Sequence, residues 1–217
     1  MTSAKLIAYL GPAGTYSHQA VLQHVGSPED TVGRYEYVPY PTIADCFTAI
    51  ETGAVSFAVV PFSNSTNGPV KFTYDLIRQS NPRPLVLADT KVAVNHYVLA
   101  SRECIQQINR AGEQAIKVIY SHPQVWGQCK TWLANHFTTA KKIDTDSTAL
   151  ATQIVADRDD AIAIASKAAL QVADVQVFKD KIQDSKDNFT RFLVIKRYEG
   201  EDKNDLDHEI SKEVDSI

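Results

Sequence analysis

The stretch KLIAYLGPAGTYSHQAVLQHV, residues 5–25, decides the fold class of this sequence. It opens with a short, largely apolar run that ends at Gly11, and a polar turn follows. Ala20, Val21 and Val25 then recur at the spacing of one helix face. The stretch therefore predicts a strand, a loop and a helix, in that order.

The same alternation continues along the chain. Further apolar strands are expected at residues 35–40, 55–60, 118–120, 161–165 and 192–196. Further helices are expected at residues 42–51, 126–135 and 166–172. Because strands that alternate with helices are joined by crossover connections, we expect an α/β fold with largely parallel sheets.

Two extended stretches predict a division into two lobes. Residues 85–100 would cross from the first lobe to the second, and residues 182–195 would return. We expect lobe 1 to hold about residues 1–92 with 180–198, and lobe 2 to hold about residues 93–179. Such a path leaves a ligand cleft beside the strand ends.

The C-terminal segment has a different character from the rest of the chain. Residues 199–217 are strongly acidic and nearly devoid of aromatic residues. We therefore expect a folded domain over residues 1–198, followed by a solvated tail or a frayed helix.

Composition and charge exclude several classes of protein. The hydrophobic share of 44% is that of an ordinary folded domain, and the net charge of -4 lacks the basic surplus of a nucleic-acid-binding protein. No apolar run approaches the ~20 residues of a bilayer span and no signal peptide is evident, so we expect a cytoplasmic protein without a membrane partner.

Cys46, Cys104 and Cys129 are scattered and odd in number, which favours reduced structural thiols.

Small polar residues gather just after the predicted strands, where α/β proteins bind ligands. The segments are residues 11–17, 63–68, 121–124 and 146–148. For any one segment, capping of a following helix is the better explanation, because Ser, Thr, Asp and Asn satisfy free N–H groups there. Their recurrence at strand ends is the first indication of a binding site.

Several catalytic motifs are missing. The first loop does not complete G-x-G-x-x-G and no P-loop lysine follows, although its N–H groups around Gly14 and Thr15 can face a carboxylate. The six histidines lack metal-ligand spacing, so we expect neither a metal nor another cofactor. Ser121 precedes His122 without the G-x-S-x-G elbow of a serine nucleophile.

The segment Asn188-Phe189-Thr190-Arg191-Phe192 is the most unusual in the chain, because a hydroxyl and a guanidinium are adjacent at the start of an apolar strand. Neighbours in a strand point to opposite faces, but at a strand end or a bend both can line one cleft. The alternative is an edge strand with an exposed arginine. The residues alone leave both open.

Taken in order, these segments resemble the fingerprint of the prephenate dehydratase family. The resemblance covers residues 6–196. It rests on LGPAGTYS at 10–17, VPFSNSTNG at 60–68, SHPQ at 121–124, QC at 128–129, ST at 147–148, AIAS at 163–166 and NFTRF at 188–192.

The resemblance implies a fold similar to type II periplasmic binding proteins, with two α/β lobes around a cleft. It implies the decarboxylating dehydration of prephenate to phenylpyruvate in L-phenylalanine biosynthesis, and it favours a homodimer. The catalytic positions that it implies are Thr190, Arg191 and Asn64. The implied substrate contacts are Ser65, Thr66, Ser121, Gln128, Ser147, Thr148, Gly14, Thr15 and Phe192.

The implied reaction needs little machinery, because losing the ring carboxylate and the hydroxyl creates an aromatic ring. The protein must bind a dianion, align the departing groups and help the hydroxyl leave as water. The planar fork of Arg191 suits a carboxylate, and Thr190 would donate a hydrogen bond to the departing hydroxyl.

Two departures from the family pattern stand out. Ser63 occupies a position where the family usually has a glutamate, which removes a carboxylate from the expected cleft. Most members also continue into an ACT domain that senses phenylalanine, whereas this sequence ends at Ile217. We therefore expect no phenylalanine feedback in this polypeptide, and the missing domain weakens the expectation of a dimer.

Three alternatives remain open at the level of sequence. An enzyme of the same fold that decarboxylates prephenate without aromatising it would lack the T-R-F motif, so residues 190–192 argue against it. Arogenate, the amino analogue of prephenate, is not separated from prephenate as substrate. A protein that binds a small anion without chemistry is compatible with the fold and with Ser63.

Overall fold

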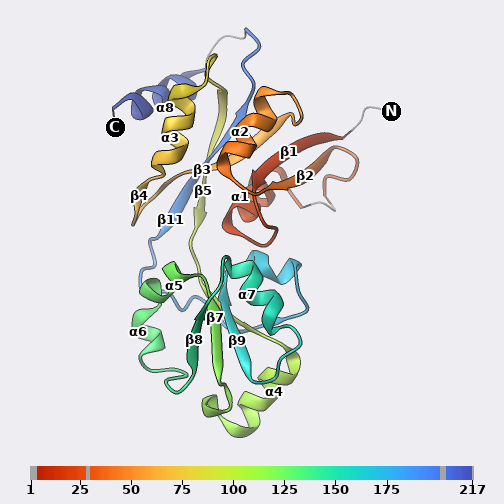
Figure 1. The fold of residues 1–217 in the computed structure, drawn as a ribbon, viewed down its shortest axis with the longest axis vertical. Coiled ribbons are helices and arrows are strands. Elements are labelled where there is room, and N and C mark those ends of the chain that lie inside the picture. Colours follow the sequence, from red (N-terminus) through yellow and green to blue (C-terminus); the bar gives the residue numbers. More distant parts are fainter. Residues whose placement is uncertain (1–3, 28–29, 201–203, 217) are drawn as a thin grey trace. The chain divides into compact units, whose positions relative to one another are not determined.

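The computed structural model describes residues 4–27, 30–200 and 204–216 (Figure 1). The chain forms two compact units. Unit 1 comprises residues 1–12, 17–93 and 189–217, and unit 2 comprises residues 13–16 and 94–188. Each unit has its own sheet and core.

The sheet of unit 1 has the strand order β2-β1-β3-β11-β5, and β4 pairs with β3. Its strands are β1 (Lys5–Leu10), β2 (Tyr35–Tyr40), β3 (Phe57–Asn64), β4 (Gly68–Pro69), β5 (Leu85–Ala93) and β11 (Phe189–Lys196). β1 runs parallel to β2 and β3, whereas β11 runs antiparallel to both β3 and β5. The returning strand therefore lies inside the sheet and not at its edge.

Helices cover both faces of this sheet. They are α1 (Tyr16–Val25), α2 (Ile43–Glu51), α3 (Lys71–Gln79) and α8 (Asp205–Asp215). Buried residues of α2, α3 and α8 share one core with Ala8 of β1 and Leu193 of β11. Tyr9 follows Ala8 and points to the other face, where its ring stacks on His18 of α1 with centroids 5.1 Å apart.

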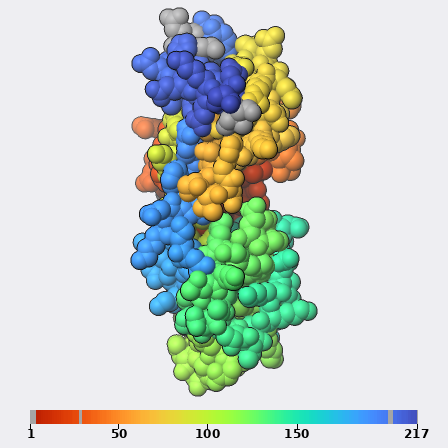
Figure 2. Space-filling view, turned by 90° about the vertical axis from the view of Figure 1, so that its left-hand side faces the viewer, coloured from red at the N-terminus to blue at the C-terminus, as the bar shows by residue number. Residues whose placement is uncertain are grey.

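For the C-terminal segment we expected a solvated tail or a frayed helix, and the structure shows a helix, α8, that is packed against unit 1 and not frayed. Asn204 caps the helix, and Ile210 and Val214 are 2% and 0% exposed in the core of unit 1. Figure 2 shows α8 (dark blue) lying against α3 (yellow). Leu206, Ile210 and Val214 recur every four residues and so form one apolar face, which the acidic composition of the segment hides.

The sheet of unit 2 has the strand order β10-β6-β9-β7-β8. Its strands are β6 (Tyr97–Ala100), β7 (Val118–Ser121), β8 (Lys141–Asp144), β9 (Ala161–Ala165) and β10 (Gln176–Lys179). Its helices are α4 (Arg102–Ala111), α5 (Pro123–Gln128), α6 (Lys130–Leu133) and α7 (Thr148–Val155), with short 3-10 turns at Glu113–Ala115 and Lys167–Gln171. Every residue of β9, with the sequence AIAIA, is buried, because both faces of this strand are covered.

The predicted α/β class is confirmed, and several details differ. Both sheets are mixed, because β11 in unit 1 and β6 in unit 2 run antiparallel to their neighbours. The helix expected at 126–135 is broken at Cys129, and the one expected at 166–172 is a 3-10 turn. Residues 180–188 belong to unit 2, although the sequence placed them in lobe 1.

The three thiols are free and buried. Burial raises the pKa of Cys46 and Cys129 to about 12 and that of Cys104 to about 11, which keeps all three as neutral core residues. Within the described ranges, no helix has the length and apolar character that crossing a membrane requires. The same residues contain no group of three or more His, Cys, Asp or Glu side chains arranged to hold a metal ion.

Candidate active site

Thr190 and Asn64 meet at the ends of β11 and β3, where the antiparallel register pairs them directly. The Asn64 amide Nδ2 donates to Thr190 Oγ1 at 3.0 Å and to the Phe189 carbonyl at 3.1 Å. Its Oδ1 accepts from the main-chain N–H groups of Thr66 (2.9 Å) and Asn67 (3.0 Å). Those two partners are obligatory donors, so they fix which end of the amide is oxygen.

This assignment determines what the Thr190 hydroxyl does. Its oxygen accepts from Asn64, so its own hydrogen can be donated to another acceptor. The side chain is only partly buried. A hydroxyl that accepts from an amide is polarised and becomes a better donor. The arrangement suits hydrogen bonding to an oxygen atom of a ligand.

The turn after β3 is fastened to the start of β11. Ser65 N donates to the Phe189 carbonyl at 2.9 Å, and Phe189 N donates to Ser65 Oγ at 3.0 Å. Ser65 and Thr66 are exposed in unit 1, as a role in ligand binding requires. Phe192 is only 2% exposed, so its ring packs in the core and is not available to stack on a ligand.

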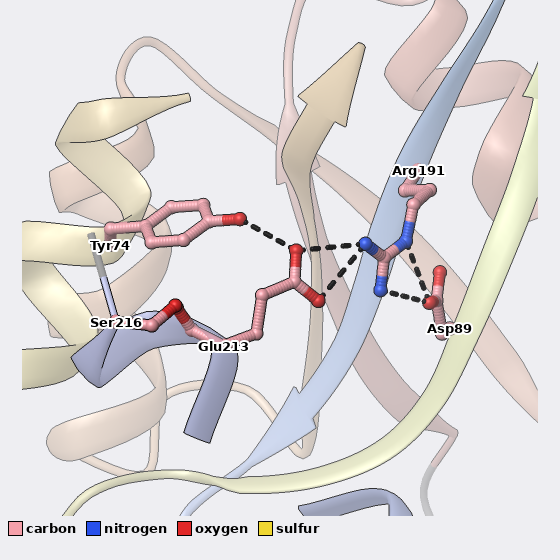
Figure 3. Close-up of polar contacts among 5 residues, drawn as sticks. All are labelled: Tyr74, Asp89, Arg191, Glu213 and Ser216. Carbon is pink, nitrogen blue, oxygen red and sulfur yellow. Dashed lines mark hydrogen bonds and ion pairs between the residues drawn. The ribbon is translucent and has the colours of Figure 1, made fainter. Parts of the chain in front are cut away.

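Arg191 corrects the expectation of a free guanidinium fork (Figure 3). Its Nε and Nη2 donate to Asp89 Oδ2 at 2.9 and 2.6 Å, and its Nη1 donates to both carboxylate oxygens of Glu213 at 2.9 and 3.1 Å. The guanidinium also lies 5.1 Å from the Phe62 ring centroid. Burial lowers the pKa of Arg191, but the hydrogen bonds and charges of Asp89 and Glu213 outweigh burial and raise it.

The side chains of Thr190 and Arg191 diverge. Leu193, two residues beyond Arg191, lies in the core beneath α8, and Arg191 contacts Glu213 of α8 on that same face. Alternation along β11 therefore turns Thr190 to the opposite face. The edge-strand interpretation is wrong, because β11 lies between β3 and β5, and the catalytic role of Arg191 stays a prediction for a side chain that is here paired with Asp89.

Four predicted substrate contacts lie in the long segment of unit 2, residues 94–188, and Gly14 and Thr15 lie in its short segment, residues 13–16. Ser121 is fully buried and its Oγ donates to the Ile164 carbonyl at 2.6 Å. Ser147 caps α7 by accepting from Leu150 N at 3.0 Å, and Thr148 begins that helix. Capping thus accounts for the Ser147 hydroxyl, as the alternative interpretation expected.

The fourth contact in unit 2, Gln128, belongs to a buried polar chain that the sequence did not reveal. Its Oε1 lies 2.6 Å from His96 Nε2, and His96 Nδ1 lies 3.2 Å from the Tyr16 hydroxyl, which donates to the Asn95 carbonyl at 2.7 Å. His96 is 1% exposed. Burial lowers the pKa of His96, a trend that the bond to Gln128 opposes. A neutral imidazole therefore anchors the Gln128 side chain.

Gly14, in the loop after β1, packs against other residues of unit 2. Gly14 has a φ of +83°, and an added Cβ would lie 3.1–3.2 Å from Val172 and Ala169. The Gly14 carbonyl accepts from Ser166 Oγ at 3.2 Å. A glycine is required at this position for both conformation and close packing. Thr15 is the next residue, and α1 begins directly after it at Tyr16.

Lowering the pH should destabilise the chain through His96. Because the pKa of His96 in the folded state is below its ordinary 6.5, the unfolded chain binds the proton first as pH falls. We expect the melting temperature to drop between about pH 7 and pH 5, and the drop to be smaller in His96→Gln. His208→Gln, on the exposed side of α8, is the matched control. An identical pH slope in wild type and His96→Gln would contradict the assignment.

Comparisons with known proteins follow the same segments. The family model for prephenate dehydratase matches residues 7–200. A probable prephenate dehydratase of Saccharomyces cerevisiae is 34% identical, over 93% of this chain and 68% of that protein. The prephenate dehydratase of Bacillus subtilis is 32% identical, over 87% of this chain and 63% of that protein.

Solved structures agree on the fold. The prephenate dehydratase of Arthrobacter aurescens, solved in complex with L-Phe, superposes with a TM-score of 0.73 at 22% identity, over 92% of this chain and 62% of that one. This chain spans about half to two thirds of the length of the relatives it matches. The family match covers both units and includes Asn64 and Thr190. The chain belongs to the prephenate dehydratase family.

Proposed function

We propose that this chain converts prephenate to phenylpyruvate, with loss of carbon dioxide and water. Family membership supports the substrate, and the pair of Asn64 and Thr190 is the observation that carries the chemistry. The C–C bond to the ring carboxylate breaks and its electrons enter the ring. The C–O bond to the ring hydroxyl breaks, and that group takes up one proton to leave as water.

Thr190 is the proposed donor to the departing hydroxyl. The Asn64 amide donates to its oxygen at 3.0 Å, which leaves its hydrogen available for another acceptor. A donor that is already in place needs no reorganisation as charge develops on the leaving oxygen. An alcohol is a weak acid, so the role of Thr190 is to position and relay the proton.

The substrate carboxylates need partners other than Arg191, whose fork is paired within unit 1. Hydroxyl, side-chain amide and main-chain N–H groups are the remaining donors among the predicted contacts. Gln128, Ser121, Ser147 and Thr148 stay predictions as substrate contacts, and so does the shared ligand cleft. The homodimer and the cytoplasmic location are part of the same proposal, and light scattering on purified protein would measure the first.

A turnover assay tests the proposed activity. Purified protein is incubated with prephenate and, separately, with arogenate, and phenylpyruvate and phenylalanine are quantified. We expect phenylpyruvate from prephenate. Carbon dioxide release without an aromatic product would identify a decarboxylase instead, and tight binding of prephenate without turnover would identify a binding protein. Either result would overturn the proposal.

Asn64→Asp tests the amide separately from the turn. The carboxylate still accepts from Thr66 N and Asn67 N, but it replaces the donor that faces Thr190 with an acceptor. The Thr190 hydrogen would then turn to the introduced carboxylate, and we expect kcat to fall about 10-fold or more. Asn67→Asp adds the same charge at an exposed position of the same turn and serves as the control. Equal kcat in both variants would remove the amide from the mechanism.

A further inference from the structure

Helix α8 lies beyond residues 7–200, which the family model matches, yet it is part of unit 1. Besides burying Ile210 and Val214, it is bonded to Val86 at the start of strand β5. Asn204 Nδ2 donates to the Val86 carbonyl at 3.0 Å, and Asp207 Oδ1 accepts from Val86 N at 3.0 Å. These contacts fix the position of α8 along the sheet.

From this position α8 reaches the residue next to Thr190. Glu213 accepts two hydrogen bonds from Arg191 Nη1, and the Tyr74 hydroxyl of α3 donates to the same carboxylate at 2.9 Å (Figure 3). Asp89 of β5 occupies the other edge of the guanidinium. Helix α8 and strand β5 therefore bond the Arg191 side chain directly, and α3 holds the Glu213 carboxylate.

Arg191 lies beside an irregularity in the pairing of β11 with β3. The pairing of β11 with β3 shifts register between Arg191 and Phe192, so only Thr190 and Arg191 pair with β3 beyond the irregularity. A bulge disrupts the backbone ladder and lets the strand bend. β5 pairs with this end of β11 on its other side, and the side-chain bonds of Arg191 add a further restraint from the face of the sheet opposite Thr190.

Arg191 carries one positive charge but is bonded to two carboxylates, Asp89 and Glu213, so the second carboxylate must have a role other than neutralisation. Asp89 alone neutralises Arg191, and its side chain is 17% exposed against 34% for Glu213. Glu213 is therefore not needed to balance the guanidinium charge. Its two bonds to Nη1 instead fix the direction of the fork, which is a geometric effect.

We propose that Glu213 is a positioning residue, which acts through Arg191 to hold the backbone of β11 so that Thr190 stays in register with Asn64. This inference rests on the proposed function for its effect on turnover. Its effect on β11 does not depend on any substrate. Helix α8 would then contribute to catalysis by positioning Thr190, in addition to covering the core of unit 1.

Kinetics of Glu213→Ala test the effect on turnover. We expect kcat for prephenate to fall about 10-fold while KM stays within about 2-fold, because the substrate does not touch Glu213. Glu213→Gln keeps an acceptor for Nη1 and should recover most of kcat, and it decides the matter if Glu213→Ala does not fold. Glu209→Ala, one helical turn earlier and exposed, should match wild type.

Amide hydrogen exchange at Thr190 and Arg191 tests the positioning itself. Exchange should be faster in Glu213→Ala than in wild type and unchanged in Glu209→Ala. If wild type does not turn over prephenate, the proposed function is overturned. The exchange rates would still show whether Glu213 holds the backbone of β11. Unchanged exchange in Glu213→Ala, or a kcat loss shared by Glu209→Ala, would overturn this inference.

Discussion

Thr190→Ala should lower kcat for prephenate about 100-fold or more while leaving the fold intact. The substitution removes the hydroxyl that Asn64 holds and that would donate to the departing oxygen. Loss of one well-placed donor commonly has an effect of about this size. The side chain is only partly buried, so the change in unfolding free energy should be small, about 1 kcal/mol.

Thr190→Ser is the matched comparison. Serine keeps the oxygen and the donor, so kcat should stay within about 10-fold of wild type, with a loss from its freer rotamer. Thermal melts of both variants show whether the fold survives. If Thr190→Ala keeps wild-type kcat while it remains folded, Thr190 has no part in the chemistry.

Arg191→Met should destabilise the chain by about 3 kcal/mol, measured as the unfolding free energy in urea. The substitution leaves Asp89 and Glu213 without their shared cation, and Asp89 Oδ1 already lacks a hydrogen-bond partner among the described residues. Removing one partner of a buried ion pair typically costs about 3–5 kcal/mol, and the partial exposure of Glu213 favours the lower end.

Two controls separate this network from a general effect of lost charge. Arg197→Met removes an arginine whose pair with Glu199 is half exposed on both sides, so a loss below about 1 kcal/mol is expected. Arg191→Met combined with Asp89→Asn should regain part of the lost stability. A stable Arg191→Met with a strongly raised KM would instead restore a substrate-binding role for the guanidinium.

Local patterns predicted some elements of this fold and missed others, among them the helices α3, α4 and α7. The run KLIAYL forms β1, AIAIA forms the fully buried β9, and Ser147 caps α7, because each outcome depends on residues close in the chain. The break at Cys129 carries only a weak local signal, Gly127, since apolar spacing continues through α5 and α6 and no proline interrupts it. Asp184 bonds both sides of the break, because its N–H donates to the Gln128 carbonyl at 2.8 Å and its carboxylate accepts from Thr131 N at 3.1 and 3.2 Å.

The sequence predicted which residues belong to the candidate site better than it predicted which side chains they contact. Asn64 and Thr190 were named from the sequence, and their pairing follows from the register of β3 and β11. The partners of Arg191 lie 102 and 22 residues away, and Tyr16 lies 80 residues from His96. No periodicity connects such positions, so a side chain that looks available in the sequence can already be paired in the fold.

The bonds between α8 and Val86 also matter for solubility. β5 is the last strand of its sheet, and its outward N–H and C=O groups are the kind on which another chain can add a strand. Asn204 and Asp207 occupy both groups of Val86. A polypeptide shortened to residue 200 would bare this edge together with the apolar surface beneath α8, and self-association through β5 would compete with folding.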